Sequence, residues 1–307
     1  MRTARRGVPA VLLAAAAALG TACGHSANGL PAVSAGKLRV VAAENFWGSI
    51  AAQLGGTRAA VSSVVVSPEA DPHSYEATAG DGVTIAQSQL AIVNGIGYDP
   101  WASKLLAADP SSSRVVLDVG KLLGLGQGEN PHQWYSPASV RRVVGAIVAG
   151  YERLDPAGRS YFEGRRAALE RTGLAEYDRL RAEIRRRFAG VPVGYSESIF
   201  QPLGADLGLR LMTPDGFAKA ISEGTDVSAA DKRTVDAQAE DGAIRVWVFN
   251  RQNTTPDVQR VNQLARARHI PTATITETLS PASASFEQWQ SAQLRALVAA
   301  LHEATGR

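Results

Sequence analysis

Short apolar runs of β type alternate with helical patterns along most of this chain, and this alternation is the feature that most constrains its fold. Valine- and isoleucine-rich runs that are separated by helices are typical of βα units, in which a parallel sheet is buried on both faces. The predicted strands are residues 38–42, 61–66, 90–94, 114–119, 191–195, 244–249 and 272–276. The predicted helices include residues 46–54, 101–108, 231–239, 256–268 and 286–304. The sequence therefore predicts an α/β fold in two halves, with a different segment between them.

That middle segment, residues 155–189, is charged and has no strand pattern. Its apolar residues recur at spacings of three and four, which predicts one amphipathic helix with a single buried stripe, made of Tyr177, Leu180, Ile184 and Phe188. A helix of about 30 residues spans roughly 45 Å, at about 1.5 Å per residue. We therefore expect a long, rigid helix with a slight bend at Gly173, joining an N-terminal lobe, residues 38–154, to a C-terminal lobe, residues 190–307.

The first 22 residues have the pattern of a signal peptide. Three arginines precede a nearly unbroken apolar run, residues 8–19, and small residues follow it. This run is shorter than the roughly 20 apolar residues that a membrane-spanning helix needs. The pattern predicts that the chain is exported and that residues 1–22 are removed.

Cys23 follows this signal and is the only cysteine, so no disulfide can form within one chain. Its place is similar to that of the acylated cysteine in bacterial lipoproteins, although Gly20 stands where such sites usually carry leucine. The alternative is ordinary cleavage that leaves an inert thiol. The lipoprotein interpretation predicts a chain anchored through Cys23 to the outer face of the cell membrane, with residues 23–37 as a flexible tether.

The net charge excludes one class of partner. The formal charge of +3 equals the three arginines of residues 1–22, which contain no acid, so the mature chain is close to neutral. Proteins that bind nucleic acid need a strongly basic surface, and we therefore expect no nucleic-acid partner. The remaining residues suffice for two ordinary domains.

Two of the five histidines stand in matching settings, each directly after a proline and two residues before an aromatic residue. His73 lies in Asp-Pro-His-Ser-Tyr-Glu, and His132 lies in Asn-Pro-His-Gln-Trp-Tyr. Proline restricts the backbone of a loop, and imidazole is the commonest metal-binding side chain. A structural role is the alternative for either histidine alone, but the matching pair indicates a shared metal site.

Several short segments, which follow one another in the same order as in a known family, carry a resemblance to that family: Asn45-Phe46-Trp47, residues 71–76, Asn94-Gly95, residues 130–134, residues 196–200, residues 221–225 and residues 276–279. With these segments the chain resembles the metal-binding lipoproteins of zinc- and manganese-type ABC importers. The resemblance implies two α/β lobes that are joined by one long helix, with a metal held in the cleft between them. It covers nearly all of the mature chain.

The resemblance also implies four metal ligands, which correspond here to His73, His132, Glu197 and Glu277. Glu277 departs from the family pattern, which usually has aspartate, so its binding distance and denticity stay open. Both acids follow predicted strands, and ligand sites in open α/β sheets lie beyond the carboxyl ends of strands. Asp226 is the competing candidate for the fourth ligand.

The resulting hypothesis is an exported lipoprotein that captures Mn²⁺ or Zn²⁺ and delivers it to an ABC transporter permease, as a monomer and without catalysis. Carboxylate oxygens suit Mn²⁺ and imidazoles suit Zn²⁺, so the two oxygen donors favour manganese. The resemblance points the same way, because zinc-importing members of the family often carry a histidine-rich loop that this sequence lacks. One alternative is an extracytoplasmic zinc-dependent hydrolase, although the sequence has no His-Glu-x-x-His motif. Another is a receptor of similar build for an iron chelate or cobalamin.

Overall fold

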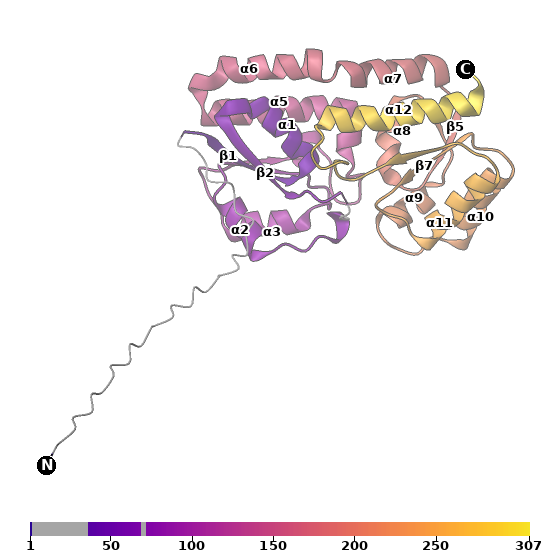
Figure 1. Cartoon of the computed structure of the whole chain (residues 1–307), viewed down its shortest axis with the longest axis horizontal. Helices are drawn as coiled ribbons and strands as arrows, with labels where there is room; N and C mark the ends of the chain where they lie inside the picture. The colour runs from indigo at the N-terminus through magenta and orange to yellow at the C-terminus, as the bar shows by residue number, and fades with distance from the viewer. Residues whose placement is uncertain (2–35, 69–71) are drawn as a thin grey trace.

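The computed structural model describes Met1, residues 36–68 and residues 72–307. The predicted signal peptide beyond Met1, Cys23 and nearly all of the tether lie outside these residues. The described chain forms two α/β lobes side by side, beneath a common layer of helices (Figure 1). This arrangement confirms the predicted fold class. In the described part of the chain, no helix combines the length and the apolar character that crossing a membrane requires.

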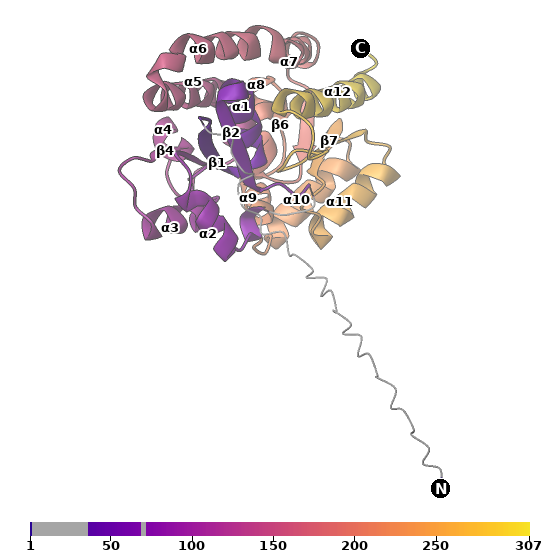
Figure 2. The ribbon, with the colours of Figure 1, turned by 60° about the vertical axis from the view of Figure 1, so that its left-hand side comes forward.

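The N-terminal lobe is built on a parallel sheet with the strand order β2-β1-β3-β4. Helices α1 and α5 cover one face of this sheet, and α2 and α3 cover the other (Figures 1 and 2). The elements are β1 (Leu38–Glu44), α1 (Asn45–Gly55), β2 (Ala59–Val65), α2 (Ala79–Ala86), β3 (Leu90–Val93), α3 (Pro100–Ala108), β4 (Val115–Asp118), α4 (Val119–Leu123) and α5 (Pro137–Leu154).

The C-terminal lobe repeats this plan with the strand order β6-β5-β7-β8, again parallel. Helix α12 packs on one face of its sheet, and α11 lies on the other, beside α10 (Figure 1). The elements are β5 (Pro192–Tyr195), α8 (Gln201–Asp206), β6 (Arg210–Leu211), α9 (Asp215–Ser222), α10 (Ala229–Glu240), β7 (Val246–Asn250), α11 (Pro256–Ala267), β8 (Thr272–Ile275) and α12 (Phe286–Thr305).

The linking segment is helical along most of its length but is not one regular helix. A π-helical turn, Leu169–Gly173, separates α6 (Arg159–Ala168) from α7 (Ala175–Phe188). Buried Leu169 and Tyr177 are eight positions apart, which would turn them about 80° away from each other on an ideal α-helix. Both positions fit one apolar stripe of ordinary width, and both side chains lie in the core on either side of the π turn.

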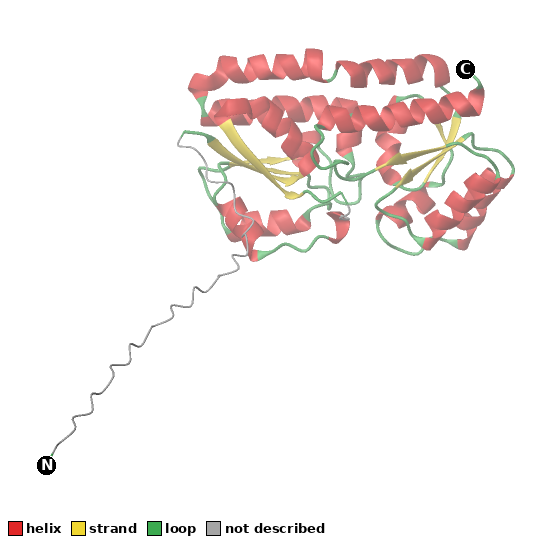
Figure 3. Cartoon of the chain, viewed as in Figure 1, coloured by secondary structure: helices red, strands yellow, loops and turns green. Residues whose placement is uncertain are grey.

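The carboxyl ends of the two sheets supply the loops that meet between the lobes (Figure 3). The Leu279 amide donates to Asn45 Oδ1 at 3.2 Å, and Thr278 Oγ1 donates to the Ser67 carbonyl at 3.1 Å. Asn130 Nδ2 donates to the Ser198 carbonyl at 2.8 Å. Residues far apart in sequence are therefore held together at this junction, where the predicted site would lie.

Candidate metal centre

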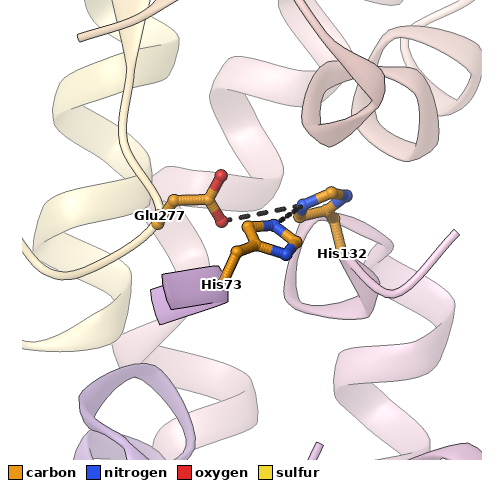
Figure 4. A group of neighbouring side chains, drawn as sticks. All are labelled: His73, His132 and Glu277. Atoms are coloured by element: carbon orange, nitrogen blue, oxygen red, sulfur yellow. Dashed lines mark hydrogen bonds and ion pairs between the residues drawn. The ribbon is translucent and has the colours of Figure 1, made fainter. Parts of the chain in front are cut away.

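Three of the four predicted ligands lie together at the junction between the lobes. One ligand atom from each of His73, His132 and Glu277 lies within 4.8 Å of the other two, and the three side chains converge on one point (Figure 4). The Nε2 atoms of the two histidines are 3.4 Å apart, and His132 Nε2 is 3.7 Å from Glu277 Oε2. Within the described residues, no other set of three histidine, cysteine or acidic side chains comes this close.

His132 is held in one orientation by the asparagine two residues before it. Asn130 Oδ1 lies 2.8 Å from His132 Nδ1 and also accepts the His132 backbone N–H at 3.0 Å. An amide oxygen can only accept, so Nδ1 carries the ring proton and the lone pair of Nε2 faces Glu277 and His73. Asn94 supports the same loop, because its Nδ2 donates to the Pro131 carbonyl at 2.9 Å. These contacts preorganise Nε2 as a donor atom for a cation.

The surroundings of His132 keep its imidazole neutral. The side chain is fully buried, and burial, together with the nearby His73, holds its pKa well below 6.5. Trp134 packs edge-on against the ring with centroids 5.3 Å apart, and it stacks on Phe46. Trp134 thus both walls the site and packs into the lobe. A neutral imidazole is the form that binds metal.

Glu277 follows β8 and is almost completely buried, at 1% exposure. Tyr98 of the N-terminal lobe donates its hydroxyl to Glu277 Oε2 at 3.0 Å, and Asn250 Nδ2 donates to Oε1 at 3.0 Å. The carboxylate is therefore fixed on both oxygens, with Oε2 directed at the histidines. His73 lies in the short turn Pro72–Ser74 and is more open to solvent than the other two residues of the group.

The structure does not bring Glu197 into this group. Its side chain is fully buried, and its Oε2 accepts from Asn253 Nδ2 at 3.2 Å and from Ser222 Oγ at 3.4 Å. Ser222 Oγ in turn lies 2.8 Å from Ser198 Oγ, which is 3.4 Å from His132 Nδ1. A chain of hydroxyl groups therefore connects Glu197 with His132. The role of Glu197 as a metal ligand stays a prediction, as do the roles of His73, His132 and Glu277 as ligands.

Asp226, the competing acid, is exposed in the loop between α9 and α10. It is not part of the group of three. Of the two candidates for the fourth position, the structure therefore places Glu277 beside the histidines and leaves Asp226 at the surface.

A cleft of about 620 Å³ leads to the histidines from solvent. Both lobes line it, with His73, His132 and Asn130 from the N-terminal lobe and Ser198, Gln201 and Lys219 from the C-terminal lobe. The cleft therefore extends to His73 and His132, whereas Glu277 does not line it and is enclosed by protein. Two nitrogen donors and one carboxylate form a donor set that suits a divalent transition metal.

The fold and this group define a class: two-lobed α/β binding proteins with a metal-type donor set between the lobes. The chain belongs to the family described as zinc-uptake complex component A, periplasmic, whose model matches residues 40–300. The fold is shared with solved structures, including a crystal structure of ZnuA, with a TM-score of 0.66, 21% identity and coverage of 87% of this chain and 99% of that one. A Mn-bound periplasmic metal-binding protein from Candidatus Liberibacter asiaticus gives a TM-score of 0.70 at 18% identity, covering 86% of this chain and 100% of the other.

Curated relatives match over shorter stretches. The manganese-binding lipoprotein MntA of Halalkalibacterium halodurans is 25% identical over 147 residues, which are 46% of this chain and 48% of the relative. The iron-binding protein YfeA of Yersinia pestis is 26% identical over 59% of this chain and 60% of its own length. The zinc-binding protein TroA of Treponema pallidum is 27% identical over 42% of each chain. The chain therefore spans about half the length of these relatives, whose names differ in the metal.

Residues that support the site were not predicted from the sequence. Tyr98, Asn250 and Asn253 each contact one of the candidate acids, and Asn130 orients His132. The sequence held one signal for Asn250, because this residue ends a buried apolar strand and ligand sites in such sheets lie at the carboxyl ends of the strands. The contacts of Tyr98 join distant parts of the chain, and no local pattern indicates them.

Proposed function

We propose that this protein captures a divalent transition metal outside the cytoplasm and delivers it to an ABC permease for import. The observation that carries this proposal is the convergence of His73, His132 and Glu277 between the two lobes. Its support is membership of the zinc-uptake family, together with relatives whose names describe manganese, zinc or iron binding. The metal is cargo, and the donor groups bind it without reacting.

We propose Glu197 as the remaining ligand. Its buried carboxylate is connected to His132 through the hydroxyl groups of Ser222 and Ser198, and joining the group would require it to leave its contacts with Ser222 and Asn253. Two imidazoles and two carboxylates would leave a bound dication formally neutral, which makes its burial tolerable. Four protein ligands also close the shell, whereas catalytic metal sites keep a position for water or substrate. A coordination count by X-ray absorption on the loaded protein tests this, because a shell of three residues and a water would favour a hydrolase.

Manganese is the proposed cargo, with zinc as the competing one. Two oxygen donors suit Mn²⁺, although Zn²⁺ generally binds more tightly to a given site. Elemental analysis of protein that is purified without added metal, together with growth of a deletion strain under manganese or zinc starvation, tests the choice. Rescue of the deletion strain by zinc alone would overturn manganese as the cargo.

We further propose that Cys23 carries a lipid that anchors the mature chain to the outer face of the cell membrane. The chain is then expected to be released into the medium when Cys23→Ser removes the acylation site. Membrane fractionation of cells with the wild-type and variant chains measures this. Equal retention of both chains would refute the lipid anchor and leave metal capture untouched.

A further inference from the structure

The loop at the carboxyl end of β7, counted from the last strand residue Asn250 to Asn253, contacts both candidate acid ligands. In the sheet order β6-β5-β7-β8, strand β7 lies between β5 and β8. Glu197 follows β5 and Glu277 follows β8, so the loop at the carboxyl end of β7 emerges between the two acids. Its first and last residues are Asn250 and Asn253, and each directs its side-chain amide at a different acid.

Asn250 fixes Glu277. The Asn250 side chain is fully buried, and its Nδ2 donates to Glu277 Oε1 at 3.0 Å. Its Oδ1 accepts the backbone N–H of Gln252 at 3.0 Å, which sets the direction of the amide group. Oε1 is therefore occupied by a donor, while Oε2 faces His132 at 3.7 Å. Asn250 on Oε1 and Tyr98 on Oε2 therefore fix the orientation of the carboxylate, with Oε2 on the side of the histidines.

Asn253 contacts Glu197 in the same way. Its Nδ2 lies 3.2 Å from Glu197 Oε2 and 3.0 Å from the Ile221 carbonyl. The amide thus anchors the acid to the end of α9, where Ser222 also donates to Oε2. Because Glu197 is buried, these hydrogen bonds decide how its carboxylate is oriented.

Gln252, between the two asparagines, ties the loop to its surroundings. Its Oε1 accepts the Thr278 amide at 3.2 Å, next to Glu277, and its Nε2 donates to the Pro68 carbonyl at 2.8 Å. Pro68 belongs to the N-terminal lobe, in the connection between β2 and the turn that carries His73. The loop is thereby held against both lobes.

We propose that Asn250 and Asn253 are positioning residues for metal binding, each acting through one acid: Asn250 through Glu277 and Asn253 through Glu197. The loop fixes the carboxylate of Glu277 within the group of three and holds that of Glu197 in its buried position outside the group. This inference rests on the proposed function, because it assumes that both acids bind the metal. Residues that orient ligands typically change metal affinity about 10- to 100-fold when they are removed.

Two crossed double-mutant cycles test the proposal, with Mn²⁺ affinity measured by competition with a chelating dye. Asn250→Ala is expected to weaken binding roughly 10- to 100-fold in the wild-type chain. In the Glu277→Ala background the same change is expected to have an effect of no more than about threefold, since its target is gone. Asn253→Ala releases Glu197 from this contact, so it is expected to change Mn²⁺ affinity while Glu197 is present, to have an effect of no more than about threefold in the Glu197→Ala background, and to act independently of Glu277.

Asn262→Ala is the matched control. Asn262 is a buried asparagine of the same lobe whose Oδ1 accepts from Trp247 Nε1 at 2.7 Å, away from both acids. This variant is expected to lower the melting temperature and to leave Mn²⁺ affinity unchanged. The visible absorption spectrum of the Co²⁺-loaded protein supplies a second readout: Asn250→Ala is expected to alter it and Asn262→Ala is not.

The outcomes separate this inference from the proposed function. If the effects of Asn250→Ala and Glu277→Ala multiply fully in the double variant, or if Asn250 couples equally to both acids, the assignment of positioning roles is wrong. Should Asn250→Ala fail to fold, the cycle of Asn253 with Glu197 decides in the same way. A wild-type chain without tight Mn²⁺ or Zn²⁺ binding would instead refute the proposed function.

Discussion

Replacing Glu277 distinguishes the two acids that compete for the fourth position of the proposed site. Glu277 is 1% exposed and lies 3.7 Å from His132 Nε2, whereas Asp226 is exposed. Removing one partner of a buried charge pair costs about 3–5 kcal/mol, because the other charge is left uncompensated. At about 1.4 kcal/mol for each factor of ten, this corresponds to a loss of affinity of roughly two to three and a half orders of magnitude. A substitution at an exposed position typically changes a free energy by no more than about 0.5 kcal/mol.

Glu277→Gln is the cleaner variant for this comparison. Alanine would leave the Tyr98 hydroxyl and the Asn250 amide without their acceptor, at a cost to stability of about 1–3 kcal/mol for each. Glutamine keeps the volume and removes the charge. Affinity for Mn²⁺ is measured by titration against a competing chelator, and melting of the metal-free chain controls for folding. A greater loss in Asp226→Ala than in Glu277→Gln would refute this reasoning and move the fourth ligand to Asp226.

Three further predictions concern the two histidines, the pH dependence of metal binding and the pH dependence of the stability of the fold. His73→Ala and His132→Ala are each expected to abolish tight metal binding and to preserve the far-UV circular dichroism spectrum; unchanged affinity in either would contradict the site. Metal binding is expected to weaken in acid, because imidazole ligands must be deprotonated; since burial holds the pKa of His132 well below 6.5, the loss through His132 is expected well below that pH, and a constant affinity down to the pH at which the chain unfolds would argue against histidine ligation. Glu44→Gln is expected to make the metal-free chain more stable near pH 7.5 and to change it little near pH 4, as measured by urea unfolding.

The fold was predictable from the sequence because its signals are local. Most of the predicted strands are largely buried, and their runs of apolar β-branched residues indicate this burial; the exceptions are residues 61–66, 114–119 and 272–276. Helix α5 was not predicted, although Ser136 caps its start, Pro137 opens it and valines recur along its buried face. The π turn at Leu169–Gly173 was also not predicted; the sequence analysis placed only a slight bend at Gly173, the last residue of this turn.

The candidate site was predictable only in part. The two histidines have a recognisable local setting, and both acids follow strands, so their positions at the carboxyl ends of the sheets could be inferred. The conformation of Glu197 could not, because it depends on Asn253 and on Ser222, which are distant in sequence. The choice between Glu277 and Asp226 depended in the same way on which loop lies beside His132 in three dimensions.

The prediction for Glu44 rests on a buried pair of acids near Asn94, the residue that supports the His132 loop. Glu44 and Asp99 are each 1% exposed. Burial, and to a smaller extent the neighbouring Asp99, raises the pKa of Glu44 well above its usual value. Burial also raises the pKa of Asp99, to about 6. In the window between about pH 4 and pH 6, the folded chain keeps protons that the unfolded chain has lost, so stability falls as the pH rises. For Asp99 alone this amounts to about 3 kcal/mol, at about 1.4 kcal/mol per pKa unit. Glu44→Gln removes the second buried charge, so the variant is expected to lose less stability than the wild type as the pH rises from about 4 to 6. An identical pH dependence of stability in both chains would show that Glu44 does not titrate in this range.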